Sequence, residues 1–157
     1  MVQPIHADQA TVDTRRVLLW HWGKEGAGAK FSSALARGLR DLPGTEIAIS
    51  AASSSDLERE ISGSTDLPLQ SVRIFEGNKA SLSGKLAAGF ALLGLPRIGA
   101  EFFGAMEEFR PDVALCAFQS IWDLAALPVL RRAASRFVLV LHDAEPHPGD
   151  RYPMRGV

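Results

Sequence analysis

The feature that most constrains the fold is the alternation of short apolar runs with segments that carry apolar residues at helical spacing. Each run has the length of a strand, and strands that alternate with helices form a parallel sheet with right-handed crossovers. We therefore predict an α/β fold with three layers, in which helices cover both faces of a mostly parallel five-stranded sheet in the strand order 3-2-1-4-5. The predicted strands are residues 16–21, 46–50, 69–75, 112–117 and 137–142.

The segments between these runs predict the helices. Apolar residues recur at helical spacing from Phe31 to Leu42, and the pattern stops at Pro43. Ser120 is placed to cap the last predicted helix, and Pro128 forces a kink or a restart within it. The helices predicted after the first are residues 56–61, 83–93, 98–109 and 121–135.

The composition indicates one soluble globular domain. Of the 157 residues, 46% are hydrophobic and 22% are charged, which is enough apolar material for a core. Residues 1–14 mix polar types and are expected to form a flexible leader, which leaves residues 15–157 as a single domain. The 17 basic and 18 acidic residues give a net charge of -1, so no nucleic-acid partner is expected.

The sequence also bears on the cellular compartment. The only cysteine, Cys116, lies in an apolar run and is expected to be a buried, inert thiol, which fits a cytoplasmic protein. The most apolar stretch, residues 86–106, is interrupted by glycine, proline and charged residues, so it is not expected to span a membrane. Residues 82–103 leave open a peripheral contact with the inner face of the membrane.

A sheet of this order predicts where a ligand binds. Ligands of such folds lie at the carboxyl ends of the strands, near the point where the strand order reverses. The corresponding segments are residues 21–28, 119–120 and 142–150. The residues predicted to line this crevice are Gly26, Gly28, Ser120 and His142.

Residues 22–30 form a glycine-rich segment between the first strand and the first helix. Its backbone amides are placed to meet a phosphate or a sugar hydroxyl at a helix N-terminus. The segment lacks the Lys-Ser/Thr pair of a Walker loop, and Phe31 stands where a G-x-G-x-x-G pattern needs its last glycine. A second interpretation, in which Gly26 and Gly28 only shape a tight turn, also fits the sequence.

The densest cluster of titratable residues follows the last predicted strand. Residues 142–150 hold His142, Asp143, Glu145, His147 and Asp150. Short His and Asp side chains can hydrogen-bond sugar hydroxyls. Metal binding is an alternative, but the spacing matches no zinc signature and no metal is expected. A plain surface turn shaped by the prolines is a third interpretation.

Four segments occur in the order and spacing of a known family. They are Trp22-Gly-Lys-Glu-Gly-Ala-Gly-Ala, Leu35-Ala-Arg-Gly-Leu39, Phe109-Arg-Pro-Asp-Val113 and Val138-Leu-Val-Leu-His-Asp-Ala-Glu-Pro-His-Pro-Gly-Asp150. Across residues 16–150 the chain resembles the N-terminal domain of family-4-type GT-B glycosyltransferases. The His-Asp segment is the most specific of the four, whereas the Pro-Asp pair is common in other proteins.

This resemblance implies the Rossmann-like, acceptor-side half of an enzyme that moves a sugar from a nucleotide-sugar donor to a glycan, lipid or small-molecule acceptor, without a cofactor. His142 is implied to be catalytic, beside the reacting carbon of the donor sugar. Lys24 and Glu25 depart from the family, in which another glycine is common at this point. The implied substrate-binding residues are Gly26, Ala27, Gly28, Ser120, Asp143 and His147.

A complete enzyme of this family also has a second, donor-binding Rossmann domain, for which this sequence shows no counterpart. We therefore expect the chain alone to transfer no sugar, and its uncovered domain face to allow self-association. The only nearby cations, Lys24 and Lys30, are placed on a mobile turn and are not expected to clamp the donor diphosphate. The alternative function is a non-catalytic flavodoxin-like or receiver-like binding module, although His21 and Trp22 supply no acidic pair of the receiver type.

Overall fold

The computed structural model describes residues 14–63, 67–74, 92–133 and 136–141. Within them, five strands form one sheet in which every neighbouring pair is parallel. The sheet order is β3-β2-β1-β4-β5, so the predicted α/β fold and its strand order are confirmed. The strands are β1 (Arg15–His21), β2 (Thr45–Ala52), β3 (Leu69–Val72), β4 (Val113–Cys116) and β5 (Arg136–Leu139).

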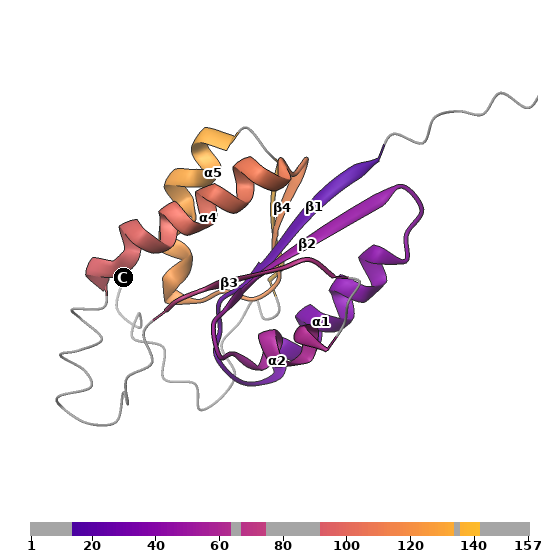
Figure 1. Cartoon of the computed structure of the whole chain (residues 1–157), viewed down its shortest axis with the longest axis horizontal. Coiled ribbons are helices and arrows are strands. Elements are labelled where there is room, and N and C mark those ends of the chain that lie inside the picture. Colours follow the sequence, from indigo (N-terminus) through magenta and orange to yellow (C-terminus); the bar gives the residue numbers. More distant parts are fainter. Residues whose placement is uncertain (1–13, 64–66, 75–91, 134–135, 142–157) are drawn as a thin grey trace, which may run out of the picture.

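Helices cover both faces of this sheet and give the chain three layers (Figure 1). One face carries α1 (Ala27–Arg40) and α2 (Asp56–Ser62). The other carries α4 (Leu95–Phe109) and α5 (Leu127–Ala133), together with the short 3-10 helices η1 (Leu92–Gly94) and η2 (Ile121–Ala125).

The central strand β1 contributes to the core on each face of the sheet. Its side chains alternate between the two faces. Leu18 and Trp20 belong to the core beneath α4, and Val17 and Leu19 belong to the core beneath α1. The α4 side is aromatic, with the Trp20 and Phe102 rings edge to face at 5.4 Å. A strand buried on both faces requires the continuous apolar run seen in the sequence.

The start of α1 differs from the prediction. The helix begins at Ala27, so Gly28 and Lys30 lie in its first turns rather than in a loop. Gly26 is the N-cap, with φ 103° and ψ -168°, a conformation that is essentially restricted to glycine. The glycine-rich turn is therefore shorter than the sequence suggests, and Lys30 is not on a mobile turn.

The helix predicted over residues 121–135 is interrupted, as Pro128 requires. The 3-10 helix η2 ends at Ala125, and α5 restarts at Leu127 with Pro128 as its second residue. Proline has no amide hydrogen to donate within a helix but is tolerated in a first turn. The predicted restart at Pro128 is confirmed.

Strand β5 does not have the covering predicted for it. A strand of apolar sequence was expected to be buried on both faces, yet the described residues leave Phe137, Val138 and Leu139 between 39% and 47% exposed. The Phe137 ring stacks on Trp20 with centroids 5.6 Å apart, and Val140 packs against the core beneath α1. The strand is thus anchored through β4 and these two contacts.

Several predictions fall outside the described residues. These are residues 1–13 of the leader predicted over residues 1–14, most of the helix predicted over residues 83–93, and the segment that contains His142, Asp143 and His147. In the part of the chain that the structure describes, no helix has both the length and the apolarity needed to cross a membrane.

Candidate functional site

The strand order reverses at β1, which lies between β2 and β4. The turn after β1 and the turn after β4 therefore lie at the carboxyl edge of the sheet, where α/β folds bind ligands. The structure brings these turns together: a Cβ on Gly28 would lie 2.9 Å from Phe118 Cγ, and the Phe31 and Phe118 rings are 6.0 Å apart. Gly26, Ala27 and Gly28 begin α1 on one side, and Ser120 precedes η2 on the other.

His21, the last residue of β1, occupies the space beneath the glycine-rich turn. Its side chain is buried, with 3% of the residue exposed. The Nδ1 atom lies 3.4 Å from the Phe118 carbonyl oxygen, and the two rings meet edge to face at 5.8 Å. A histidine that the sequence placed at the end of a strand is therefore part of the packing between the β1–α1 and β4–η2 turns.

The glycines of this turn have structural reasons to be glycine. A Cβ on Gly23 would lie 2.6 Å from His21 Cε1, and one on Gly28 would lie 2.9 Å from the same atom. Gly26 meets no such obstacle but needs its positive φ. The interpretation in which these glycines shape a tight turn thus accounts for them without a ligand.

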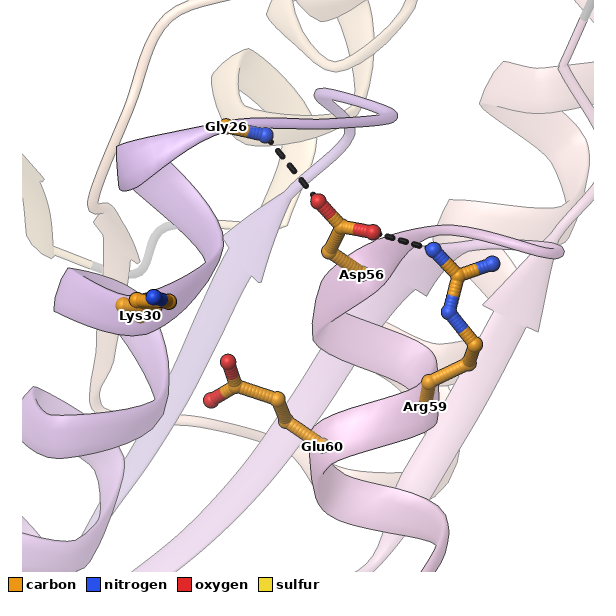
Figure 2. Close-up of a pocket in the computed structure, with 5 residues that line it drawn as sticks. All are labelled: Gly26, Lys30, Asp56, Arg59 and Glu60. Carbon is orange, nitrogen blue, oxygen red and sulfur yellow. Dashed lines mark hydrogen bonds and ion pairs between the residues drawn. The ribbon is translucent and has the colours of Figure 1, made fainter.

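The β1–α1 turn is held against the β2–α2 turn by three hydrogen bonds. Asp56 N donates to Lys24 O at 2.9 Å, and Lys24 Nζ donates to Ser53 O at 2.6 Å. In the third, Gly26 N donates to Asp56 Oδ2 at 3.0 Å (Figure 2). We call these three bonds the inter-turn clasp. The clasp fixes Lys24, which the sequence had placed on a mobile turn.

Asp56 supplies the negative charge at the N-terminus of α1. The hydrogen bond from Gly26 N lowers the pKa of the Asp56 carboxyl, and the side-chain hydrogen bond from Arg59 and the charges of Arg59 and Lys30 lower it further. Arg59 also forms an ion pair with Asp56 (Figure 2). The carboxylate therefore stands where a helix N-terminus attracts an anion. Sequence analysis missed Asp56, because nothing local indicates a partner 30 residues away.

The β4–η2 turn is held by a different aspartate. Asp123 Oδ2 accepts a 2.6 Å hydrogen bond from Ser120 N, and Asp123 Oδ1 accepts from Ser120 Oγ and from Trp20 Nε1, both at 3.2 Å. Burial raises the pKa of Asp123 despite these hydrogen bonds. Ser120, predicted as a helix cap, is the N-cap of η2. The Ser-x-x-Asp spacing of a capping box was the signal that could have revealed Asp123.

Cys116 lies beside this carboxylate. Its sulfur is 3.8 Å from Asp123 Oδ2, and burial, followed by the Asp123 charge, raises the pKa of the thiol far above its ordinary value. A thiol that does not ionise is a poor nucleophile. The prediction that Cys116 is buried is confirmed, and its raised pKa fits the expected inertness.

Of the predicted site residues, the structure places Gly26, Ala27, Gly28 and Ser120 at the carboxyl edge of the sheet. His142, Asp143 and His147 lie outside the described residues, so their predicted roles stay predictions. Among the described residues, no group of three or more histidine, cysteine or acidic side chains is arranged to hold a metal ion.

Comparison with known proteins yields similarity in structure alone. No family model and no curated protein matches the sequence. The structure is similar to MurG from Acinetobacter baumannii, with a TM-score of 0.59 and 13% identity over 80% of this chain and 34% of MurG. It is also similar to Anabaena HepE, solved with UDP and glucose, with a TM-score of 0.55 and 14% identity over 82% of this chain and 30% of HepE.

A UDP-N-acetylglucosamine 2-epimerase is similar at a TM-score of 0.53 and 12% identity, over 81% of this chain and 33% of the epimerase. The chain thus spans about a third of the length of each of these proteins. Identities this low establish the fold and leave the activity to be argued separately. The described chain has the Rossmann-like α/β fold of the N-terminal domain of GT-B glycosyltransferases.

Proposed function

We propose that this chain is the acceptor-side domain of a glycosyltransferase, which moves a sugar from a nucleotide-sugar donor to a glycan, lipid or small-molecule acceptor. The observation that carries the proposal is the similarity over about 80% of the chain to MurG and to HepE, the latter bound to UDP and glucose. The carboxyl edge of β1 and β4, where the strand order reverses, is where such a fold binds its ligands.

The proposed roles of the residues follow the family resemblance. His142 is assigned as the catalytic residue, which orients sugar hydroxyls and places its dipole where charge develops on the sugar ring. Asp143 and His147 are assigned to the acceptor. Gly26, Ala27, Gly28 and Ser120 are assigned to substrate contacts at the sheet edge, and their position there supports the assignment.

The chain alone is proposed to be inactive. Glycosyl transfer needs the donor diphosphate held and the anomeric carbon positioned at the acceptor oxygen, and such positioning is worth about 7 to 11 kcal/mol of the barrier. In the described residues, Lys24 is committed to Ser53 O and Arg59 to Asp56, so neither is placed to clamp a diphosphate. The nucleotide-sugar affinity of the isolated chain is therefore expected to be about millimolar, or ~4 kcal/mol.

A product assay tests the proposal. The 157-residue chain is incubated with a panel of nucleotide sugars and acceptors, alone and together with the donor-binding domain that the proposal requires. Transfer only in the combined sample is expected, and His142→Ala is expected to lower it by about a hundredfold or more. Turnover or micromolar donor binding by the isolated chain would contradict the two-part enzyme.

The similarity to UDP-N-acetylglucosamine 2-epimerase supports a second candidate activity, epimerisation of a nucleotide sugar. The same assay separates the two, because an epimerase converts its nucleotide sugar without an acceptor. A non-catalytic flavodoxin-like or receiver-like module is not favoured, because the similar structures named above are two glycosyltransferases and an epimerase.

A cytoplasmic location is proposed for the domain, and two surfaces bear on its proposed partners. Phe137, Val138 and Leu139 are exposed along β5, where self-association through an uncovered domain face is proposed. Phe103 and Leu124 are exposed beside the groove between α4 and η2, where a peripheral membrane contact is proposed. Sedimentation of the chain, with and without anionic vesicles, tests both.

A further inference from the structure

A cleft opens between the first turns of α1 and α2, beside the glycine-rich turn. Its volume is about 400 Å³, within the range of small-molecule sites. Figure 2 shows Asp56 and Glu60 reaching from α2 toward α1, which carries Lys30. The cleft is lined by Gly26, Lys30, Asp56, Arg59 and Glu60.

Asp56 makes this cleft a poor place for a phosphate. Its carboxylate already accepts a hydrogen bond from Gly26 N at 3.0 Å. The amide that would otherwise donate to an anion at the N-terminus of α1 therefore has an internal partner. A phosphate brought beside that carboxylate would meet a like charge, which costs about 1 kcal/mol at ~4 Å even in bulk water. Glu60, on the same wall, adds a second negative charge.

The remaining chemistry of the cleft suits an uncharged ligand. The formal charges of Lys30 and Arg59 cancel those of Asp56 and Glu60. Lys30 and Glu60 both line the cleft, so a hydrogen-bond donor and an acceptor border the same space. A sugar hydroxyl both donates and accepts, and a ring that bears several hydroxyls can bond to both groups.

We propose that Asp56 is a specificity-determining residue, which closes the N-terminus of α1 to phosphate and leaves the cleft between α1 and α2 as a subsite for an uncharged saccharide. This inference rests on the proposed function. It identifies the acceptor as an uncharged saccharide that binds in the cleft beside the glycine-rich turn. The acceptor's sugar ring contacts Lys30 and Glu60, and any phosphate of the substrates lies elsewhere.

The first arm of the test measures phosphate exclusion on the 157-residue chain. Sodium pyrophosphate is titrated while the amide NMR signals of Gly26 and Lys30 are followed. Asp56→Ala, which frees the Gly26 amide, is expected to bind pyrophosphate about tenfold more tightly than the wild type. Glu60→Gln is the matched control, because it removes one charge from the same cleft but leaves the Gly26 amide occupied.

The outcomes of this arm are distinct. Asp56→Ala must gain more affinity than Glu60→Gln for the proposal to hold. Equal gains would show that general charge, and not the occupied amide, excludes phosphate, which overturns the role of Asp56. Wild-type binding as tight as that of Asp56→Ala overturns it too. An unchanged amide spectrum outside the turn verifies that the variants fold.

The second arm tests the saccharide with a panel of methyl glycosides on the same chain. Saturable shifts at Gly26 and Lys30 are expected at about millimolar concentrations, weakened at least threefold by Glu60→Gln and by Lys30→Met. Absence of saturable shifts for every glycoside overturns the subsite. The failure of this inference is separate from that of the proposed function, because neither arm depends on sugar transfer. If the enzyme transfers sugar but its cleft binds pyrophosphate and no glycoside, the proposed function stands and this inference is wrong.

Discussion

The β1–α1 turn and the β4–η2 turn meet at the carboxyl edge of the sheet, and an aspartate holds each of them. Asp56 accepts from Gly26 N, and Arg59 pairs with it at the surface. Asp123 is largely enclosed and accepts from Ser120 N and from Trp20 Nε1. Two turns at one edge of the sheet are therefore fixed by the same chemical group in different surroundings.

The surroundings decide what each carboxylate does to stability. Hydrogen bonding to Gly26 lowers the pKa of Asp56, so its charged form is favoured in the folded chain. Burial raises the pKa of Asp123, so its charged form is disfavoured there. An exposed carboxylate can be replaced while solvent satisfies its partners, whereas loss of an enclosed one leaves its donors unpaired. We expect the Asp123 turn to matter for folding and the Asp56 turn to matter for ligand choice.

The largest expected effect is that of Asp123→Ala. The substitution leaves Trp20 Nε1 and Ser120 N without their acceptor, and it is expected to lower the free energy of unfolding by about 2 to 4 kcal/mol. Urea denaturation of the chain measures it. The matched control is Asp112→Ala, which removes an exposed carboxylate that accepts from Arg16 N at 2.8 Å. Equal losses in the two variants would remove the distinction between enclosed and exposed carboxylates.

The next effect tests the packing between the two turns. Gly28→Ala places a Cβ 2.9 Å from both His21 Cε1 and Phe118 Cγ, and these rings must shift. A loss of about 1 to 3 kcal/mol in the free energy of unfolding is expected. Gly38→Ala, in the same helix with nothing within 4 Å of the new Cβ, is the control. It is expected to gain up to about 1 kcal/mol from helix propensity.

A result of the same sign for Gly28→Ala and Gly38→Ala would contradict close packing of the turn on His21. Gly28 would then have no packing reason to be glycine, and its proposed substrate contact would be the remaining explanation.

A smaller effect is the pH dependence of the two aspartates, whose signs are opposite. The pKa of Asp123 is raised above 3.8, so the folded state holds its proton longer and the contribution of Asp123 to stability falls as pH rises through the folded pKa. The pKa of Asp56 is lowered below 3.8, so its contribution is present above that pH and is lost as pH falls.

Urea denaturation between about pH 3 and pH 7 measures both signs through the difference between the wild type and each asparagine variant. As pH rises, the advantage of the wild type over Asp123→Asn is expected to shrink, and its advantage over Asp56→Asn is expected to grow. Parallel difference curves would show that the two carboxylates share one environment, against the structure.

The fold was more predictable from the sequence than this site. The apolar runs of β1 and β4 predicted buried strands because burial on both faces leaves a local pattern. The exposure of β5 left no such mark, because its sequence is as apolar as that of a covered strand. The contact between Ser120 and Asp123 could have been predicted from the Ser-x-x-Asp capping spacing. The contact between Gly26 and Asp56 could not, because the two residues are brought together only by the fold.

The smallest expected effect on stability is that of Asp56→Ala. The hydrogen bond to Gly26 N lies at the surface, where water replaces the carboxylate, so the urea midpoint is expected to fall only slightly below that of Glu60→Ala on the same helix. The loss should instead be local. Amide hydrogen exchange at Gly26 is expected to quicken in Asp56→Ala and to stay unchanged in Glu60→Ala, because only the first variant removes the acceptor. If Asp56→Ala lowered the urea midpoint as far as Asp123→Ala, the inter-turn clasp would be essential for folding. A role of Asp56 in ligand selection alone would then be contradicted.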